Sequence, residues 1–317
     1  MRYSLLSRFR GALLGSFVGE SITNRGGIVR VGDKTAIASP HAEGDRAGKM
    51  LCNWSQIATC GSESLTRCGR LDVDDWVLEC ERTQPSLVLL KTTASSSEAV
   101  VATLPIALFF HDDRIQLRQQ LQKATSMWLH DAEASDGALA VAFAIALALT
   151  EKLDVVTLIP QILEYLESDR TPLVQLLEEV QILVEQGAGL DKTLTQLRRT
   201  VQLSGEKSHR SYLSIALAFY CFLSTPEDFR LCVTRAIRTG SQCQIVAAIA
   251  GALAGAYNSI IGIPIGWRLA ANQLDVTVKT LQQADRLLAV WSGFYDLSAV
   301  EQYPLMAVAA PRVIQPR

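Results

Sequence analysis

The clearest pattern along the chain is a series of apolar runs with helical spacing. Residues 137–149 are Ala-rich and uncharged, which predicts a buried central helix. The run 245–257 (IVAAIAGALAGAY) is shorter than the roughly 20 apolar residues that a membrane span needs. Gly251 and Gly255 are four residues apart and share one helical face. This spacing indicates the closest contact between two helices of the core.

The N-terminal segment 3–22 shows the same spacing. Gly11, Gly15 and Gly19 repeat every four residues within it, so they lie on one side of a helix. A signal peptide has no need of such a face. We therefore expect the segment to form the first helix of the core.

Several helix starts have recognisable signals. Thr171-Pro172 and Thr225-Pro226 each place a capping residue before a proline at the first helical position, and Asp72 is expected to begin a further helix. Ser241 and Gln244 fit an S-x-x-Q capping box, with Ser241 at the N-cap of the helix over 245–257.

The rest of the chain reads as helices and loops. The Gly-rich segment 23–49 is expected to be a loop, and 86–90 is either a short strand or a buried turn of helix. The segment 99–110 is apolar and contains Pro105. Further helical segments are expected over 50–67, 114–130, 191–201, 211–223, 229–238 and 275–291. Strand signals are nearly absent, so we predict an all-α fold with a single domain over residues 1–317.

Composition limits the partners of the protein. Thirty basic and thirty-two acidic residues give a net charge of −2, so no overall field attracts nucleic acid or anionic lipid. The seven cysteines have no CxxC spacing, which indicates neither a zinc site nor a disulfide framework. We expect a cytoplasmic protein with no nucleic-acid and no membrane partner.

Several stretches, in order, resemble the motifs of the ADP-ribosylglycohydrolase family. RFRGALLGSFVGES resembles the family's RxxGALLGxxxGDAxG start, and SSSEAVVATLPIALFF resembles its NGxxMRxAPLAL segment. The stretch CNWSQIATCGSESL resembles the TDDTxM motif and the helix that follows it. The apolar helix over 245–257, with its polar lead-in, resembles GGDTDTxAAIAGALAGA. The resemblance covers about residues 8–270 and leaves a C-terminal helix and tail over 271–317.

The resemblance implies a compact all-α fold and a reaction that removes ADP-ribose from modified side chains with two magnesium ions. The chain departs from the family at the ligand positions. Cys52, Asn53, Trp54 and Ser55 occupy the Thr-Asp-Asp-Thr positions, and Gln242, Cys243, Gln244 and Ile245 occupy the Asp-Thr-Asp-Thr positions. In two other motifs Ser97 and Glu98 replace Asn-Gly, and Glu20 replaces Asp.

These departures bear on the chemistry. Magnesium is held by carboxylates, because neutral oxygens do not offset its double charge, and the indole of Trp54 fills space that an ion needs. We therefore predict that the magnesium pair is lost, with no metal and no other cofactor. Gln242 and Gln244 still offer amide oxygens to a ligand.

Two functions follow. The first is a non-hydrolytic binding or regulatory module whose partner is an ADP-ribose-like nucleotide or another protein. The second is an active hydrolase that cleaves N- or O-glycosidic bonds through a rearranged site, for which Glu20, Glu43 and Glu98 are the weak catalytic candidates. The residues expected to line the ligand cleft are Cys52, Asn53, Trp54, Ser55, Ser97, His130, Gln242, Cys243 and Gln244.

Overall fold

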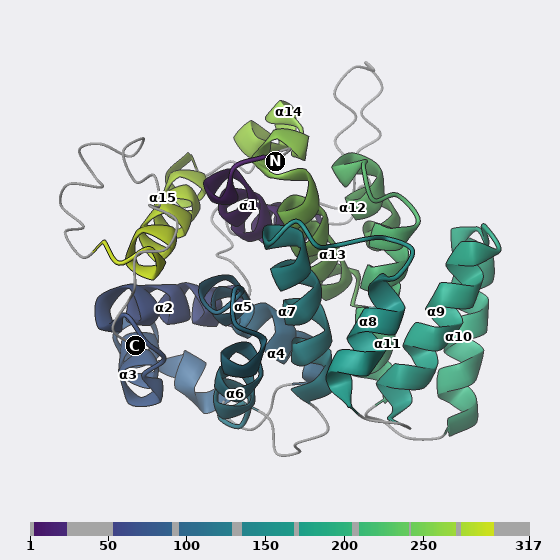
Figure 1. Cartoon of the computed structure of the whole chain (residues 1–317), viewed down its shortest axis with the longest axis horizontal. Helices are drawn as coiled ribbons and strands as arrows, with labels where there is room; N and C mark the ends of the chain where they lie inside the picture. The colour runs from purple at the N-terminus through teal and green to yellow at the C-terminus, as the bar shows by residue number, and fades with distance from the viewer. Residues whose placement is uncertain are drawn as a thin grey trace, which may run out of the picture.

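The computed structural model describes residues 3–23, 53–90, 95–128, 135–167, 171–204, 209–240, 242–270 and 274–294. These residues form helices and no strand (Figure 1), so the predicted all-α fold class is confirmed. The elements in chain order are α1 (Leu5–Thr23), α2 (Asn53–Cys68), α3 (Val73–Thr83), η1 (Pro85–Leu90), α4 (Ser96–Ala102), α5 (Leu104–Phe109), α6 (Arg114–Thr125), α7 (Asp136–Leu149), α8 (Leu158–Leu166), α9 (Pro172–Glu185), α10 (Leu190–Ser204), α11 (His209–Leu223), α12 (Phe229–Ile237), α13 (Cys243–Asn258), η3 (Ile260–Gly262), α14 (Ile265–Ala270) and α15 (Leu274–Trp291).

Helices α1 and α13 form the tightest contact of the core. A Cβ built at Gly15 would clash with the carbonyl oxygen of Gly251, and one at Gly11 would clash with that of Gly255. Gly19 lies against the carbonyl of Ala247 in the same way. The two glycine series therefore face each other, which confirms the interpretation drawn from their spacing.

Helix α7 is the buried helix predicted over 137–149. Every residue from Asp136 to Leu149 is buried. Figure 1 shows α1, α7 and α13 in the middle of the molecule, with α2, α3 and α15 on one side and α8–α11 on the other. The apolar side chains of these helices form one continuous core.

Two of the predicted helix starts are confirmed. Asp72 is the N-cap of α3, where its side chain accepts a hydrogen bond from the Asp75 amide. Thr171 is the N-cap of α9 and Pro172 follows in its first turn.

The start predicted at Thr225-Pro226 is wrong. Helix α12 begins at Phe229, and Asp228 is its N-cap because its carboxylate accepts from the Leu231 amide at 2.8 Å.

The apolar segment 99–110 belongs to two short helices. Helix α4 ends at Ala102 and α5 begins at Leu104, with Thr103 between them. Pro105 lies in the first turn of α5, where its missing N–H is tolerated. The segment 86–90 belongs to the 3₁₀ helix η1, so the helical alternative is the correct one.

Across the part of the chain that the structure describes, no helix combines the length and apolar character needed to cross a lipid bilayer.

Candidate functional site

The helix ends that carry the family-like motifs meet around the α1–α13 pair. Glu20 lies near the C-terminal end of α1 and is almost fully buried, at 1% exposure. Its carboxylate accepts a hydrogen bond from the hydroxyl of Ser55, in the first turn of α2. The structure therefore brings together two of the predicted site residues, one from each of the first two motifs.

The N-terminus of α13 has a different N-cap from the predicted Ser241. Gln242 is the N-cap and has a left-handed backbone, with φ 58° and ψ 20°. Its side-chain oxygen accepts a hydrogen bond from the hydroxyl of Ser214 in α11 at 2.6 Å. Cys243 and Gln244 follow in the first turn and are partly buried.

The predicted N-cap at Ser241 is wrong by one residue, because Gln242 is the N-cap and α13 begins at Cys243. The side-chain amide of Gln242 reaches across to α11, and the pairing of Ser241 with Gln244 stays a prediction. Ser241 lies outside the described residues.

Trp54 is directed into the core. It is 7% exposed and contacts Trp128 edge-on, with ring centroids 6.1 Å apart. Trp128 makes a further edge contact with Trp76. The indole therefore fills the interior behind the start of α2, which leaves little of the ring for stacking on a ligand.

Glu98 and Ser97 are tied to the start of α4. One carboxylate oxygen of Glu98 accepts from both the amide and the hydroxyl of Ser95, each at 2.7 Å. Ser97 is fully buried, with its hydroxyl 3.3 Å from that of Ser95. Glu98 thus satisfies the orphan donors of a helix end, a structural use that competes with acid or base catalysis.

Three polar residues at these helix ends were missed by the sequence reasoning. Asp136 is 7% exposed and heads the uncharged helix α7. Ser214 is the polar partner of Gln242 in an otherwise apolar segment. Arg198 of α10 donates to the carbonyl of Thr239 at 2.8 Å, so it anchors the approach to α13. For Asp136 and Ser214, the available sequence signal was a single polar residue within or beside an apolar run.

These helix ends are neighbours in space. A Cβ on Gly137, at the start of α7, would contact Ile215 of α11 and would lie 3.7 Å from Ser96 of α4. Ser214, next to Ile215, holds Gln242 at the start of α13. We call the first turns of α2, α4, α7 and α13 together with Glu20 the helix-terminus site.

Other candidates cannot be placed. Glu43, Cys52 and His130 lie outside the described residues. Asn53 begins α2, and only its backbone is described.

The side chains present do not fit a magnesium pair. At the aligned positions, Gln242 offers a neutral oxygen that already accepts from Ser214, and Trp54 offers none. Neutral oxygens do not offset the charge of magnesium. Within the described ranges, no three His, Cys, Asp or Glu side chains are grouped so as to hold a metal ion. Because Cys52 and the segment before it are not described, loss of the metal pair stays a prediction.

Comparisons with known proteins agree with the fold and the motifs. The model of the family described as ADP-ribosylglycohydrolase matches residues 1–295. A solved structure described as an "ADP-ribosylglycohydrolase-related protein complex" is similar to this chain, with a TM-score of 0.63 and 18% sequence identity. The likeness covers 93% of this chain and 99% of that one, and at this identity it concerns the fold. A search of curated proteins found no match.

Proposed function

Because the chain belongs to the ADP-ribosylglycohydrolase family, we propose that it is a member that has lost magnesium-dependent hydrolysis and acts as a binding or regulatory module. The observation that carries this proposal is the use made of Gln242 and Trp54. Both align with the family's ligand positions, and both are engaged in contacts within the protein. Each contact supports the fold without an ion.

The helix-terminus site keeps a feature that suits a nucleotide ligand. The first turns of α2 and α13 carry the positive ends of two helix dipoles, which favour phosphate groups. Ser55 and Gln244 belong to these turns. These features support an ADP-ribose-like nucleotide as the ligand of the site.

The alternative is a hydrolase with a rearranged acid and base. Glycosidic cleavage by this route needs two carboxyl groups on opposite sides of the bond. Glu98 is held in the cap of α4, and Glu20 is buried against Ser55. Neither presents a free carboxylate to a substrate, which favours the non-hydrolytic proposal.

Binding can be measured by isothermal titration of the full chain with ADP-ribose. We expect saturable binding that EDTA leaves unchanged. Gln244→Glu adds a negative charge in the first turn of α13 and should weaken binding by roughly 5-fold, as expected for about 1 kcal/mol of repulsion. Gln175→Glu makes the same change in the first turn of α9 and serves as the matched control. Absence of heat at millimolar ADP-ribose would leave a protein as the partner.

Hydrolysis can be tested on the same preparation. Proteins carrying ADP-ribose on arginine or serine would be incubated with the chain, with and without EDTA, and released ADP-ribose measured. We expect no release above the uncatalysed background. Turnover that EDTA abolishes would overturn the proposal, because it would require a working metal pair.

A further inference from the structure

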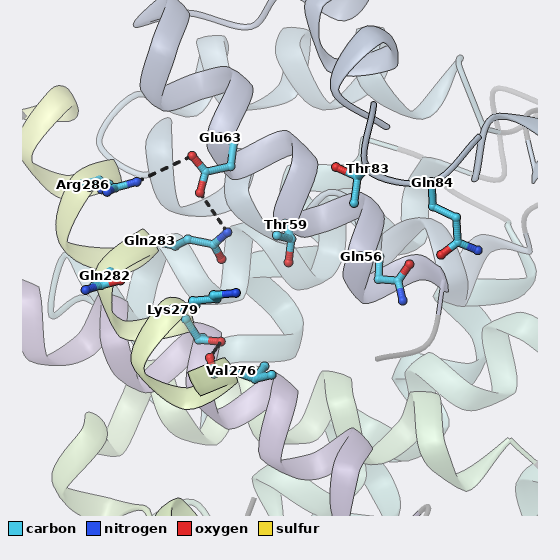
Figure 2. Close-up of a pocket in the computed structure, with 11 residues that line it drawn as sticks. Gln56, Thr59, Glu63, Thr83, Gln84, Val276, Lys279, Gln282, Gln283 and Arg286 are labelled. Atoms are coloured by element: carbon cyan, nitrogen blue, oxygen red, sulfur yellow. Dashed lines mark hydrogen bonds and ion pairs between the residues drawn. The ribbon is translucent and has the colours of Figure 1, made fainter. Parts of the chain in front are cut away.

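A pocket lies between α2 and α15 and borders the helix-terminus site at Gln56, in the first turn of α2. It has a volume of about 550 Å³, which is within the range of small-molecule sites. Figure 2 shows side chains from the two helices facing each other across it. The lining residues are Gln56, Thr59, Glu63, Thr83, Gln84, Val276, Lys279, Thr280, Gln282, Gln283 and Arg286. Every one of them except Val276 has a polar side chain.

Among the charged side chains that line this α2–α15 pocket, one cationic group is available to pair with a ligand. Glu63 accepts a hydrogen bond from Gln283 at 3.2 Å and lies 3.9 Å from the guanidinium of Arg286, so these two charges balance. Lys279 has no hydrogen bond or ion pair with any described residue, and Figure 2 shows it extending from α15 into the space between the helices. The lining therefore carries a net charge of about +1, which favours an anion.

The hydrogen bonds of the lining residues determine what a ligand must supply. The hydroxyl of Thr59 donates to the Ser55 carbonyl at 3.0 Å, and that of Thr280 donates to the Val276 carbonyl at 2.8 Å. Each hydroxyl proton is therefore used within its own helix, and the oxygens are left as acceptors. Gln283 also uses an N–H, on Glu63, which leaves its carbonyl oxygen as an acceptor.

From these two features we propose that the α2–α15 pocket binds a small polyhydroxylated anion, such as a sugar acid or a sugar monophosphate. The hydroxyl groups of the ligand donate to the oxygens of Thr59, Thr280 and Gln283, and its anionic group pairs with Lys279. A simple inorganic anion brings acceptors and leaves those oxygens without donors. A neutral sugar leaves Lys279 without a counter-charge. The two sites meet only at the first turn of α2, and the groups proposed to hold this anion are not those proposed to hold ADP-ribose.

Four probes distinguish the contribution of the ligand's charge from that of its hydroxyl groups. Isothermal titration of the full chain would use D-gluconate and ribose 5-phosphate as hydroxylated anions, glucose as the neutral sugar and acetate as the simple anion. We expect binding of one or both hydroxylated anions, and at least roughly 10-fold weaker binding of glucose and acetate, since charged hydrogen bonds account for about that factor. Equal binding of acetate and gluconate, or no heat with either hydroxylated anion, would overturn the proposal.

Variants then assign the binding to this pocket. Lys279→Met keeps the length of an exposed side chain and removes its charge, so the fold should survive. We expect Lys279→Met to weaken binding of the hydroxylated anion by roughly 10-fold. Lys192→Met, at an exposed position of α10, should leave the affinity unchanged. Thr280→Val removes one acceptor at nearly constant shape and should weaken binding several-fold. Unchanged affinity in both Lys279→Met and Thr280→Val would contradict the site.

Discussion

At the scale of single residues, two side chains that align with the family's ligand positions make contacts within the protein. Gln242 bonds to Ser214, 28 residues earlier in the chain, and Trp54 packs on Trp128. A short sequence pattern such as a capping box records only local partners, so it pointed to Ser241 and Gln244. The hydrogen bond between Gln242 and Ser214 is non-local, and a local sequence pattern has no means of indicating it.

Asp75 provides a test of stability at the same scale. Its carboxylate accepts hydrogen bonds from Ser64 and Arg67 of α2, both at 2.7 Å. Burial raises the pKa of Asp75, but the hydrogen bonds from Arg67 and Ser64 outweigh burial and lower the pKa below its ordinary value. A lowered pKa in the folded state stabilises the protein above the unfolded pKa of about 3.9, and this stabilisation is lost as the pH falls through the folded pKa.

We therefore expect Asp75→Asn to lower the free energy of unfolding at neutral pH and to make it fall less steeply on acidification to about pH 3. Urea unfolding at several pH values measures both effects. Asp74→Asn is the control, because Asp74 is also in the first turn of α3 but is exposed. Parallel pH profiles for Asp75→Asn and the parent chain would show that the ionised carboxylate does not hold α2 to α3.

At the scale of helices, the sequence predicted where most helices lie, but it predicted their first and last residues less well. The uncharged run of α7 and the glycine spacing of α1 and α13 are strong periodic signals, and both were interpreted correctly. Helix starts were less predictable because two caps can compete within a few residues. Thr171 is at the N-cap of α9 as expected, although its side chain makes no capping hydrogen bond, whereas Asp228 caps α12 in place of Thr225. The candidate site was predicted in part, since Glu20 and Ser55 do meet, but Ser214 and Arg198 come from distant helices.

The contact between α1 and α13 can be tested with a single methyl group. Gly15→Ala places a Cβ against the backbone carbonyl of Gly251, and the backbone of a packed helix cannot yield cheaply. We expect it to lower the free energy of unfolding by at least about 2 kcal/mol, measured by urea unfolding. Gly266→Ala is the control, because no atom lies within 4 Å of its added Cβ. A cost for Gly15→Ala no greater than that of the control would contradict the close packing.

At the scale of the whole molecule, the fold and the chemistry have separate requirements. The packing of this chain rests on the glycine contact of α1 and α13 and on the buried helix α7. The similarity to a solved structure at 18% identity shows how few side chains the fold requires. The metal pair would require carboxylates from two separate helices, α2 and α13, so a change at either helix is enough to remove it.

The two stretches that align with the family's metal motifs should respond differently when aspartates are introduced. Gln242 is exposed and Gln244 is partly buried, so Gln242→Asp with Gln244→Asp should yield a folded protein. Trp54→Asp should not be tolerated in the same way, because it removes a buried indole from the contact with Trp128 and places a carboxylate beside the core. We expect a loss of more than about 3 kcal/mol for Trp54→Asp, and a much smaller loss for Trp54→Phe.

Thermal unfolding with and without millimolar magnesium then tests whether the α13 stretch alone can bind the metal. An ion that binds the folded state raises its stability by about 2.7 kcal/mol at 100 times its Kd. We expect no magnesium-dependent shift in the Tm of the double aspartate variant, since the α2 stretch supplies no carboxylate at position 54. A clear rise in Tm with magnesium would show that the aspartates at the start of α13 suffice, and that the loss at Trp54 does not by itself prevent metal binding.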